Sequence, residues 1–564
     1  TYTHEIRDLK WHNTNGRPVD MKLLKTLTID DWLVEAKFIK ENLSDEIIEK
    51  AFSQFPLEVQ NEKIANAKNV LKFRRNEVEK IAAAYYKILT KSVILTASDK
   101  DDKIIVTRLD QGKTKIQFYY KDKLNFERVY DKSDTKEIWL YALDGEDMVE
   151  VKGGSNSYIK VKIIGGQNND TFIVDNGKGI TIYDYKSKKN DVSKAQKARV
   201  RLLEDYKTNT YDFYKRKEVV NKLLPVFGVN KDDGMFVGVN KTMTFKNLRQ
   251  TTFSHKHNIK ANYFIGNNGF DLGYIGEYGN IFNKMNIQFG VNYTSPNYAT
   301  NFFGLGNESE NQEDEDNLAY NRVKLAQFKT NVGIVKRGNQ GSKLSWLATF
   351  ESNRVENTPS RFVGFIATES NLFDRKNFIG SEVSYRFKNY NDSAYPTLGM
   401  DFQLYTSWKL NTADAKQSFG YVVPSFSFIH KLTKNERLVL ANKTKAHFMF
   451  SENFEFYQGA SLGADDGLRG FRFQRFRGSR SFYNSMDLRY NLRKLKSGFA
   501  PMNLGFYTGF DIGRVWLRDE NSKKWHNSYG GGLWLKVAEM ATANFGVFSS
   551  NEDTRISFGF GFGI

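Results

Sequence analysis

The first part of the chain, up to about residue 95, has the hydrophobic spacing of helices. Apolar residues recur at intervals of three and four, for example along LEVQNEKIANAKNVLKFRRNEVEKIAAAYYKIL. Thr28 and Asp31 form a capping-box pattern ahead of one helix, and Ser44 is a typical N-cap ahead of the next. The pattern predicts a helical segment over residues 1–95.

The pattern then changes to short strands separated by frequent turns. The run KIIVTRLDQGKTKIQFYY is typical of a hairpin around Asp110 and Gly112, and further short apolar runs follow it. We expect residues 96–222 to form a β-rich segment that joins residues 1–95 in one smaller α+β domain.

From about residue 223 onward, apolar and polar residues alternate in segments of about ten residues. The run MNIQFGVNY (285–293) places apolar and aromatic residues on one face and Asn, Gln and Gly on the other. A soluble β-sandwich has a charged outer face and short loops, whereas this polar face carries Gly, Asn, Ser and Tyr, and some loops are long. About sixteen such segments predict an all-β transmembrane barrel of antiparallel strands over residues 223–564.

The last ten residues, RISFGFGFGI, predict the closing strand of this barrel. Its apolar face suits lipid, and pairing with the first strand leaves no open edge. Glycines inside a strand weaken its pairing, so the two terminal strands are a candidate seam, although packing inside the lumen explains the same glycines. The residues of this candidate seam are Phe558, Gly559, Phe560, Gly561, Phe562, Gly563 and Ile564.

Composition agrees with a barrel and excludes several other classes. The chain has 15% aromatic residues, 43 Gly and only 8 Pro, and it contains no apolar run of about 18 residues that would span a membrane as a helix. Without cysteine it has no disulfide, thiolate zinc site or thiol nucleophile. The net charge of +18 fits anionic lipid or a solvated basic surface, and no nucleic-acid-binding motif accompanies it.

Two turns that contain glycine and aspartate raise the question of calcium. The run GGQNNDTF (165–172) resembles the calcium-binding repeat of secreted β-solenoids, and a half-match at Gly145 and Asp147 lies 23 residues earlier. That spacing is wider than the nine-residue coil in which neighbouring turns share ligands. Asp147 and Asp170 are candidate calcium ligands, and the alternative is tight turns in which Gly and Asn adopt positive φ.

Three motifs near the C-terminus occur in a characteristic order. LRGF (468–471) lies in a long arginine-rich loop, GFDIG (509–513) lies in a later strand, and YGGGLWL (529–535) begins the strand after that. In these motifs the chain resembles the BamA/TamA-like outer-membrane assembly superfamily, also called bacterial surface antigen barrels. The resemblance implies that the loop folds into the barrel and that Arg469, at its tip, meets Asp511 in the lumen.

The residues themselves support this contact. Asp511 shares the lumen face of its strand with glycines, which leave open space beside the carboxylate. A buried charge without a partner is costly, and Arg469 lies in a loop long enough to reach inward. We predict an Arg469–Asp511 contact that locks the loop, and the alternative is separate solvation of both side chains. The loop-lock residues are Arg469, Gly470, Phe471, Asp511 and Gly513, and for the nearby Arg472, Arg475, Arg477 and Arg480 we expect solvation, with lumen lining or lipid phosphate as alternatives.

The N-terminal part departs from that superfamily, whose periplasmic POTRA modules run β-α-α-β-β. Its helices, followed by LDGEDMVEV and IIGGQNNDTFIV, instead resemble a region of large Bacteroidetes-type outer-membrane proteins. There the region lies between a calcineurin-like metallophosphoesterase and a BamA-like barrel. The resemblance implies that residues 1–222 are periplasmic and that any such enzyme precedes Thr1, which we expect to be a processed end or the start of a fragment.

The sequence contains no catalytic constellation such as H-E-x-x-H, a G-x-S-x-G elbow or a P-loop, so we expect neither an enzyme nor a cofactor. The resemblance implies an integral outer-membrane barrel that acts in outer-membrane protein assembly or polypeptide translocation. The alternative is a membrane anchor or assembly platform for an upstream metallophosphoesterase or a partner complex. The expected partners are outer-membrane lipid and lipopolysaccharide and other outer-membrane or periplasmic proteins, but no nucleic acid.

Overall fold

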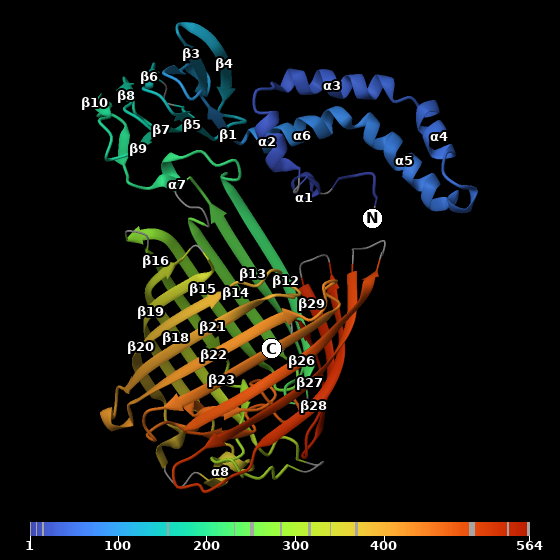
Figure 1. Cartoon of the computed structure of the whole chain (residues 1–564), viewed down its shortest axis with the longest axis vertical. Coiled ribbons are helices and arrows are strands. Elements are labelled where there is room, and N and C mark those ends of the chain that lie inside the picture. Colours follow the sequence, from blue (N-terminus) through green and yellow to red (C-terminus); the bar gives the residue numbers. More distant parts are fainter. Residues whose placement is uncertain are drawn as a thin grey trace. The chain divides into compact units, whose positions relative to one another are not determined.

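The computed structural model of the chain describes residues 2–6, 8–13, 16–154, 157–230, 232–248, 253–282, 285–313, 317–338, 340–366, 370–495, 502–537 and 541–560. The chain forms two compact units (Figure 1). The N-terminal unit contains Thr1–Glu218 together with Lys246–Thr252, and the barrel unit contains Val219–Phe245 and Phe253–Ile564.

The N-terminal unit begins with helices whose first turns are capped as the sequence predicts. Thr28 and Asp31 form the capping box of α3, and the Ser44 side chain accepts the N–H of Ile47 at the start of α4. No helix in the described part of the chain has the length and apolar character needed to cross a membrane. The helical elements are α1 (Leu9–His12), α2 (Arg17–Leu23), α3 (Ile29–Asn42), α4 (Asp45–Ser53), η1 (Leu57–Val59), α5 (Glu62–Asn76) and α6 (Val78–Thr90).

The strands of this unit form two sheets, and successive strands from β5 to β11 alternate between them (Figure 1). One sheet is parallel throughout, in the order β1-β5-β7-β9-β11, and the other has the order β10-β8-β6-β2-β3-β4. The predicted hairpin is confirmed, because β2 and β3 pair antiparallel around η2 (Asp110–Gly112). The bounds are β1 (Ser92–Thr96), β2 (Asp102–Arg108), β3 (Lys113–Tyr120), β4 (Lys123–Asp131), β5 (Glu137–Leu143), β6 (Met148–Lys152), β7 (Lys160–Gly166), β8 (Thr171–Val174), β9 (Ile180–Asp184), β10 (Asp191–Lys194), β11 (Arg199–Leu202) and α7 (Tyr206–Asn209).

The second unit is a closed antiparallel barrel, as the alternation predicts. In the described residues sixteen strands close it, and the short β17 pairs with β18 beyond the end of β16. The strands are β12 (Glu218–Asn230), β13 (Gly234–Lys246), β14 (His255–Phe264), β15 (Gly269–Phe282), β16 (Met285–Thr294), β17 (Ala299–Asn301), β18 (Arg322–Arg337), β19 (Ser342–Val355), β20 (Lys376–Lys388), β21 (Gly399–Asn411), β22 (Phe419–Lys431), β23 (Leu438–Met449), β26 (Arg480–Leu495), β27 (Met502–Trp516), β28 (His526–Val537), β29 (Ala541–Ser549) and β30 (Thr554–Phe560).

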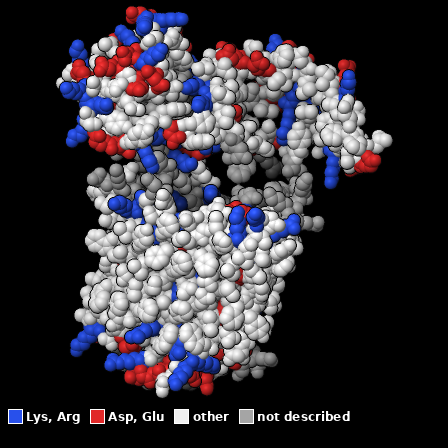
Figure 2. Space-filling view, in the orientation of Figure 1, with Lys and Arg blue, Asp and Glu red and all other residues white. Residues whose placement is uncertain are grey.

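The outer face of the barrel is apolar. Alternate side chains such as Trp346, Trp408 and Leu533 are more than half exposed, whereas their neighbours point inward and are largely polar. Figure 2 shows that Lys, Arg, Asp and Glu on the visible face of the barrel gather near its rims and are sparse between them. A closed barrel with an apolar outer band satisfies all its backbone groups in hydrocarbon, so this unit is a transmembrane barrel.

The connections between the strands differ in length at the two ends of the barrel. At the end where β12 begins, most are short, as at 338–341 and 432–437, and we call it the short-turn end. At the opposite, long-loop end lie the connections 295–321, 356–375 and 450–479. These long connections contain α8 (Phe362–Ile366), η3 (Ser370–Phe373), η5 (Phe456–Gln458), β24 (Ala460–Leu462) and β25 (Phe476–Gly478), and a shorter connection contains η4 (Ala415–Gln417).

Candidate functional site in the barrel lumen

The connection 450–479, which we call the arginine loop, contacts the inward face of β26 and β27 through Arg469. The guanidinium donates to Asp511 Oδ1 at 2.7 Å and to Asp487 Oδ1 at 2.8 Å, and the Arg469 backbone N–H donates to Asp511 Oδ2 at 3.0 Å. Both carboxylates are almost completely buried. The ring of Phe548, on β29, lies 4.0 Å from the guanidinium carbon. The structure therefore brings Arg469 and Asp511 together and adds a second carboxylate and an aromatic ring.

The glycines around this contact provide the space that it occupies. A Cβ added to Gly509 would lie 2.6 Å from Arg469 Nη2, and one added to Gly470 would lie 2.7 Å from the Ser528 side chain. A Cβ on Gly513 would come within 2.8 Å of a carbonyl oxygen of β26. Next to them Phe471 is fully buried in an apolar cluster of Leu462, Leu468, Phe471, Phe476, Tyr483 and Val515.

Three of the four arginines that follow Arg469 are not solvated, so the expectation was wrong for these three. Arg472, Arg475 and Arg477 are 3%, 2% and 4% exposed. Arg475 pairs with Glu552 at 2.7 Å, and Arg477 donates to the backbone carbonyl of Phe456 at 2.8 Å. These guanidiniums are almost completely buried, and their partners come from distant segments of the chain. Arg480 alone of the four is exposed, at the start of β26.

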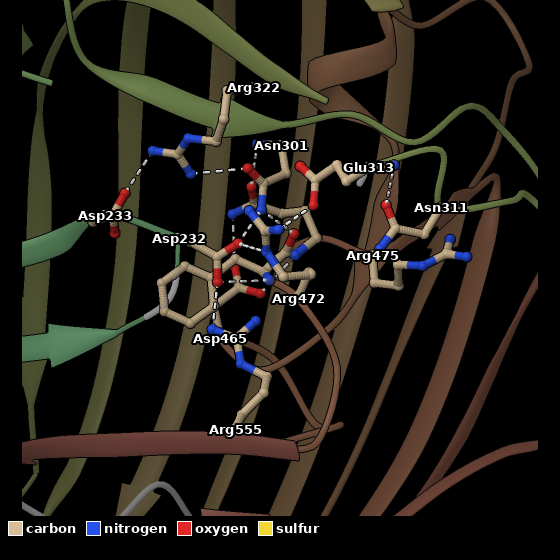
Figure 3. Close-up of polar contacts among 12 residues, drawn as sticks. Asp232, Asp233, Asn301, Asn311, Glu313, Arg322, Asp465, Arg472, Arg475 and Arg555 are labelled. Carbon is tan, nitrogen blue, oxygen red and sulfur yellow. Dashed lines mark hydrogen bonds and ion pairs between the residues drawn. The ribbon is translucent and has the colours of Figure 1, made fainter. Parts of the chain in front are cut away.

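Asp232, in the turn between β12 and β13, joins three parts of the barrel (Figure 3). Its fully buried carboxylate accepts from Arg472 Nε at 2.7 Å and from the backbone N–H of Phe473 at 3.2 Å, both in the arginine loop. The same carboxylate pairs with Arg555 of β30, and the Asn301 amide also donates to it. The first hairpin, the last strand and the arginine loop therefore meet at one carboxylate.

A second connection, residues 389–398 between β20 and β21, reaches across the lumen at the short-turn end, and we call it the strap. The ring of Tyr395 stacks on Trp534 of β28 with centroids 4.2 Å apart. Asp392 pairs with Lys536 of β28 at 2.7 Å, and another hydrogen bond joins the strap to β29. Because several strands separate β21 from β28 in the barrel, the strap is a bridge across the interior.

The candidate seam joins β12 and β30, which pair antiparallel with Val229 opposite Phe558. The Phe558 ring stacks on Phe227 at 5.2 Å. A Cβ added to Gly559 would meet no described atom within 4 Å, so close packing does not require glycine there. The remaining seam residues, 561–564, lie outside the described residues.

Asp147 and Asp170 stack on adjacent coils of the N-terminal unit. Met148 is in register with Thr171, so the spacing of 23 residues, which looked too wide for a repeat, is one full coil of this wider solenoid. The Asp147 backbone N–H donates to Asp170 Oδ1 at 2.9 Å, and the Asp102 N–H donates to Asp147 Oδ1 at 2.8 Å. Gly145, Gly166 and Asn168 have positive φ, as the tight-turn alternative predicts.

The carboxylates of this ladder are buried near one another. Burial raises the pKa of Asp147 to about 8, and the nearby carboxylate of Asp170 adds to the shift. Burial likewise raises the pKa of Asp170 and of Asp184, its close neighbour. In the described part of the chain, no group of three or more His, Cys, Asp or Glu residues is arranged to hold a metal ion, so the calcium hypothesis gains no support.

We expect the coils of the N-terminal unit to lose stability as the pH rises from about 4 to 8. The unfolded chain releases these protons near the ordinary pKa of 3.8, whereas the folded chain keeps the Asp147 proton until about pH 8. Over that range the folded state binds more protons, and its stability therefore falls with rising pH. Hydrogen exchange of peptides from β7 to β9, corrected for intrinsic rates, checks this. Protection that is constant or higher at pH 8 than at pH 5 would contradict it.

The fold and its interior define a transmembrane barrel whose lumen contains two of its own connections. No family model and no curated protein sequence matches the chain. Among solved structures it is similar to BamA from Haemophilus ducreyi lacking POTRA domains 1-3, with 14% identity, 62% of this chain and 71% of that chain covered and a TM-score of 0.44. It is also similar to CdiB from Acinetobacter baumannii (12% identity, 61% and 60% covered, TM-score 0.40) and CdiB from Escherichia coli (11% identity, 60% and 63% covered, TM-score 0.40). The chain thus spans less than two thirds of either CdiB structure.

Several residues of the site were not found by sequence reasoning. Asp232, Asp487 and Glu552 bind the arginines, and Tyr395 and Trp534 anchor the strap. Asp487 had a usable signal, because it alternates onto the lumen face of its segment as Asp511 does. The others carry no local signal, since their partners lie in remote parts of the chain.

Proposed function

We propose that this chain is an outer-membrane barrel that inserts outer-membrane proteins or passes a polypeptide, by separating β12 from β30. The composition of these two strands supports the proposal. Pro225 in β12 has no backbone N–H to donate to a neighbouring strand. The neighbouring Leu223 and Leu224 point to opposite faces of β12 and are 64% and 39% exposed, so neither side chain is closely packed. Gly559 in β30 is not required by packing. A strand pair with a proline and an unconstrained glycine is held together less firmly than its neighbours.

The arginine loop and the strap regulate passage in this proposal. The loop folds into the barrel and is locked by Arg469–Asp511, while the strap bridges the other end of the interior. Both must move before an extended chain fills the lumen. A substrate that uses only the seam leaves the strap in place.

The lengths of the connections support an orientation of the barrel. Outer-membrane barrels have short periplasmic turns and longer external loops. The short-turn end then faces the periplasm, and the N-terminal unit, whose chain runs into the start of β12 there, is periplasmic. The long-loop end meets the outer leaflet, where Arg514, next to Trp516 and Trp525, and exposed Arg480 suit the phosphates of lipopolysaccharide. Native mass spectra of the variant with both arginines changed to alanine should show less bound lipid A, and equal binding would count against this partner.

A disulfide across the seam tests the main proposal. The chain has no cysteine, so Val229→Cys with Phe558→Cys places one reactive pair at opposed positions. We expect the oxidised variant to lose insertion of an unfolded barrel protein into liposomes and secretion of a passenger polypeptide, because the strands no longer separate. Reduction should restore the activity.

The matched control places cysteines at Leu488 and Thr508, which are opposed on β26 and β27. Oxidation there should leave the activity unchanged. Full activity of the oxidised seam variant would reject a gating seam and favour the second candidate function below.

The second candidate is a membrane anchor or assembly platform, and a groove in the helical part of the N-terminal unit favours it. The groove has a cavity volume of about 630 Å³ and is lined mainly by apolar residues, among them Leu9, Trp32, Ile39 and Tyr85. Such a groove suits a partner segment. Peptide mapping and intact mass of the native protein decide which segment, if any, is joined to Thr1. A metal-liganding phosphoesterase there supports the platform, and a POTRA-like extension supports insertion or translocation.

A further inference from the structure

We infer that the arginine loop is a latch on the β12–β30 seam, so that the terminal strands separate at the long-loop end only when the loop moves. The inference deepens the proposed function and rests on it for its purpose. Its geometry rests on two contacts, Arg472 with Asp232 and Arg475 with Glu552, which reach the two sides of the seam from one loop.

The first contact holds the β12 side of the seam. Asp232 follows β12 directly in the first turn, and its carboxylate lies between the guanidiniums of Arg472 and Arg555 (Figure 3). Arg555 is the first inward-facing residue of β30 and is only 4% exposed. The ring of Phe473, also in the loop, lies 5.3 Å from the Arg555 guanidinium carbon. One buried carboxylate therefore connects β12, β30 and the loop.

The second contact holds the β30 side. Arg475 donates through Nε and Nη2 to the two carboxylate oxygens of Glu552, at 2.7 and 2.9 Å. Glu552 lies in the turn between β29 and β30 and is partly exposed, whereas Arg475 is buried. A bidentate pair of this kind fixes orientation as well as distance. Arg472 and Arg475, three residues apart, thus hold opposite sides of the seam.

The turn that carries Asp232 is itself fixed to the barrel wall. Asp233 pairs with Arg322 of β18 at 2.7 Å, and both side chains are largely buried. Because this turn is held in place, opening of the seam requires β30 and the turn between β29 and β30 to move. When β30 moves away with the loop still in place, Arg555 leaves Asp232 and Glu552 leaves Arg475, which separates two ion pairs at least partly shielded from water. When the loop withdraws first, the Arg475–Glu552 pair is already broken, and of these two ion pairs Asp232–Arg555 alone still has to separate.

The test is hydrogen exchange of the full chain in detergent micelles or nanodiscs. Arg472→Gln should raise the exchange rate of a loop peptide (470–478) and also that of a β30 peptide (552–560), each about tenfold or more, since local opening controls exchange. The peptide over β26 and β27 should stay unchanged. The matched control is Lys409→Gln, which breaks a buried ion pair with Glu351 between β19 and β21, near the same end but away from the seam, and should leave β30 exchange as in the native chain.

Exchange that rises in the loop alone, with β30 unchanged in Arg472→Gln, would overturn the latch, because the loop would then move without consequence for the seam. If Arg472→Gln does not assemble, Glu552→Gln breaks the second contact at a partly exposed position, and the same coupled rise is expected from it. A rise of β30 exchange in the Lys409→Gln control equal to that in Arg472→Gln would also overturn the latch. None of these outcomes depends on insertion or secretion, so they are distinguishable from failure of the seam disulfide test.

Discussion

Replacing Asp511 with alanine is expected to release the arginine loop from β27. The change removes the carboxylate that accepts from both the guanidinium and the backbone N–H of Arg469. Breaking a buried ion pair by removing one partner costs about 3–5 kcal/mol, and Asp487 compensates only part of it. Protease sites in residues 462–478 should become accessible, and hydrogen exchange in the same residues should become faster. The conductance of the barrel in planar bilayers should rise.

The control for this prediction is Asp511→Asn, which keeps an acceptor for the Arg469 N–H and for the Ser528 hydroxyl. It should loosen the loop less than alanine does, because the shape of the site is retained. Unchanged protection of the loop in the alanine variant would show that the Arg469 contact does not hold it.

Replacing Trp534 with alanine is expected to free the strap at the short-turn end. Trp534 is 1% exposed and stacks on Tyr395, with Tyr507 and Phe548 in the same buried cluster. Loss of a buried tryptophan costs about 3–5 kcal/mol, and here the strap has only a few polar contacts to replace it. We expect higher single-channel conductance and new cleavage sites between residues 389 and 398.

The neighbouring residue on the same strand provides the control. Leu533 is 53% exposed on the outer face, so Leu533→Ala changes a side chain at the same depth without contact with the strap. It should leave conductance unchanged. Equal conductance of Trp534→Ala and the native chain would mean that the strap does not obstruct the pore.

Phe548 packs near both Arg469, which anchors the arginine loop, and Trp534, which anchors the strap. The two alanine variants are therefore informative in combination. Its ring lies 4.0 Å from the Arg469 guanidinium carbon and belongs to the same buried cluster as Trp534. Contact alone does not establish energetic coupling, and a double-mutant cycle measures it. Effects of Asp511→Ala and Trp534→Ala on conductance that simply add would indicate two independent closures.

Much of the barrel was predictable because strand periodicity is local. In the run 285–293 the predicted lipid-facing residues lie on the more exposed side and Asn286 and Gln288 are buried inward, as two-residue alternation requires. The capping box at Thr28 was predictable for the same reason, since its two partners are three residues apart. The division of the long helical run into α5 and α6 was not predicted, because the break at Glu77 has no strong local signal.

The candidate site was only partly predictable. The Arg469–Asp511 pair was expected from a motif and from the glycines beside Asp511, and the structure places these two side chains in contact. Arg472 and Arg475 were expected to be solvated, because sequence alone does not reveal that their loop lies in a closed interior. Their acidic partners, Asp232 and Glu552, are 240 and 77 residues away, beyond any local pattern.

The sequence by itself determined the period of each segment, the face that each strand turns to lipid and the positions where helices begin. These are properties of neighbouring residues and of the two repeats, 3.6 and 2, that the backbone allows. Only the tertiary structure decided which charges are buried together. Closure of the barrel brought Asp232, Arg472 and Arg555 to one point, and stacking of the coils placed Asp147 on Asp170, because burial and pairing depend on which distant segments fold side by side.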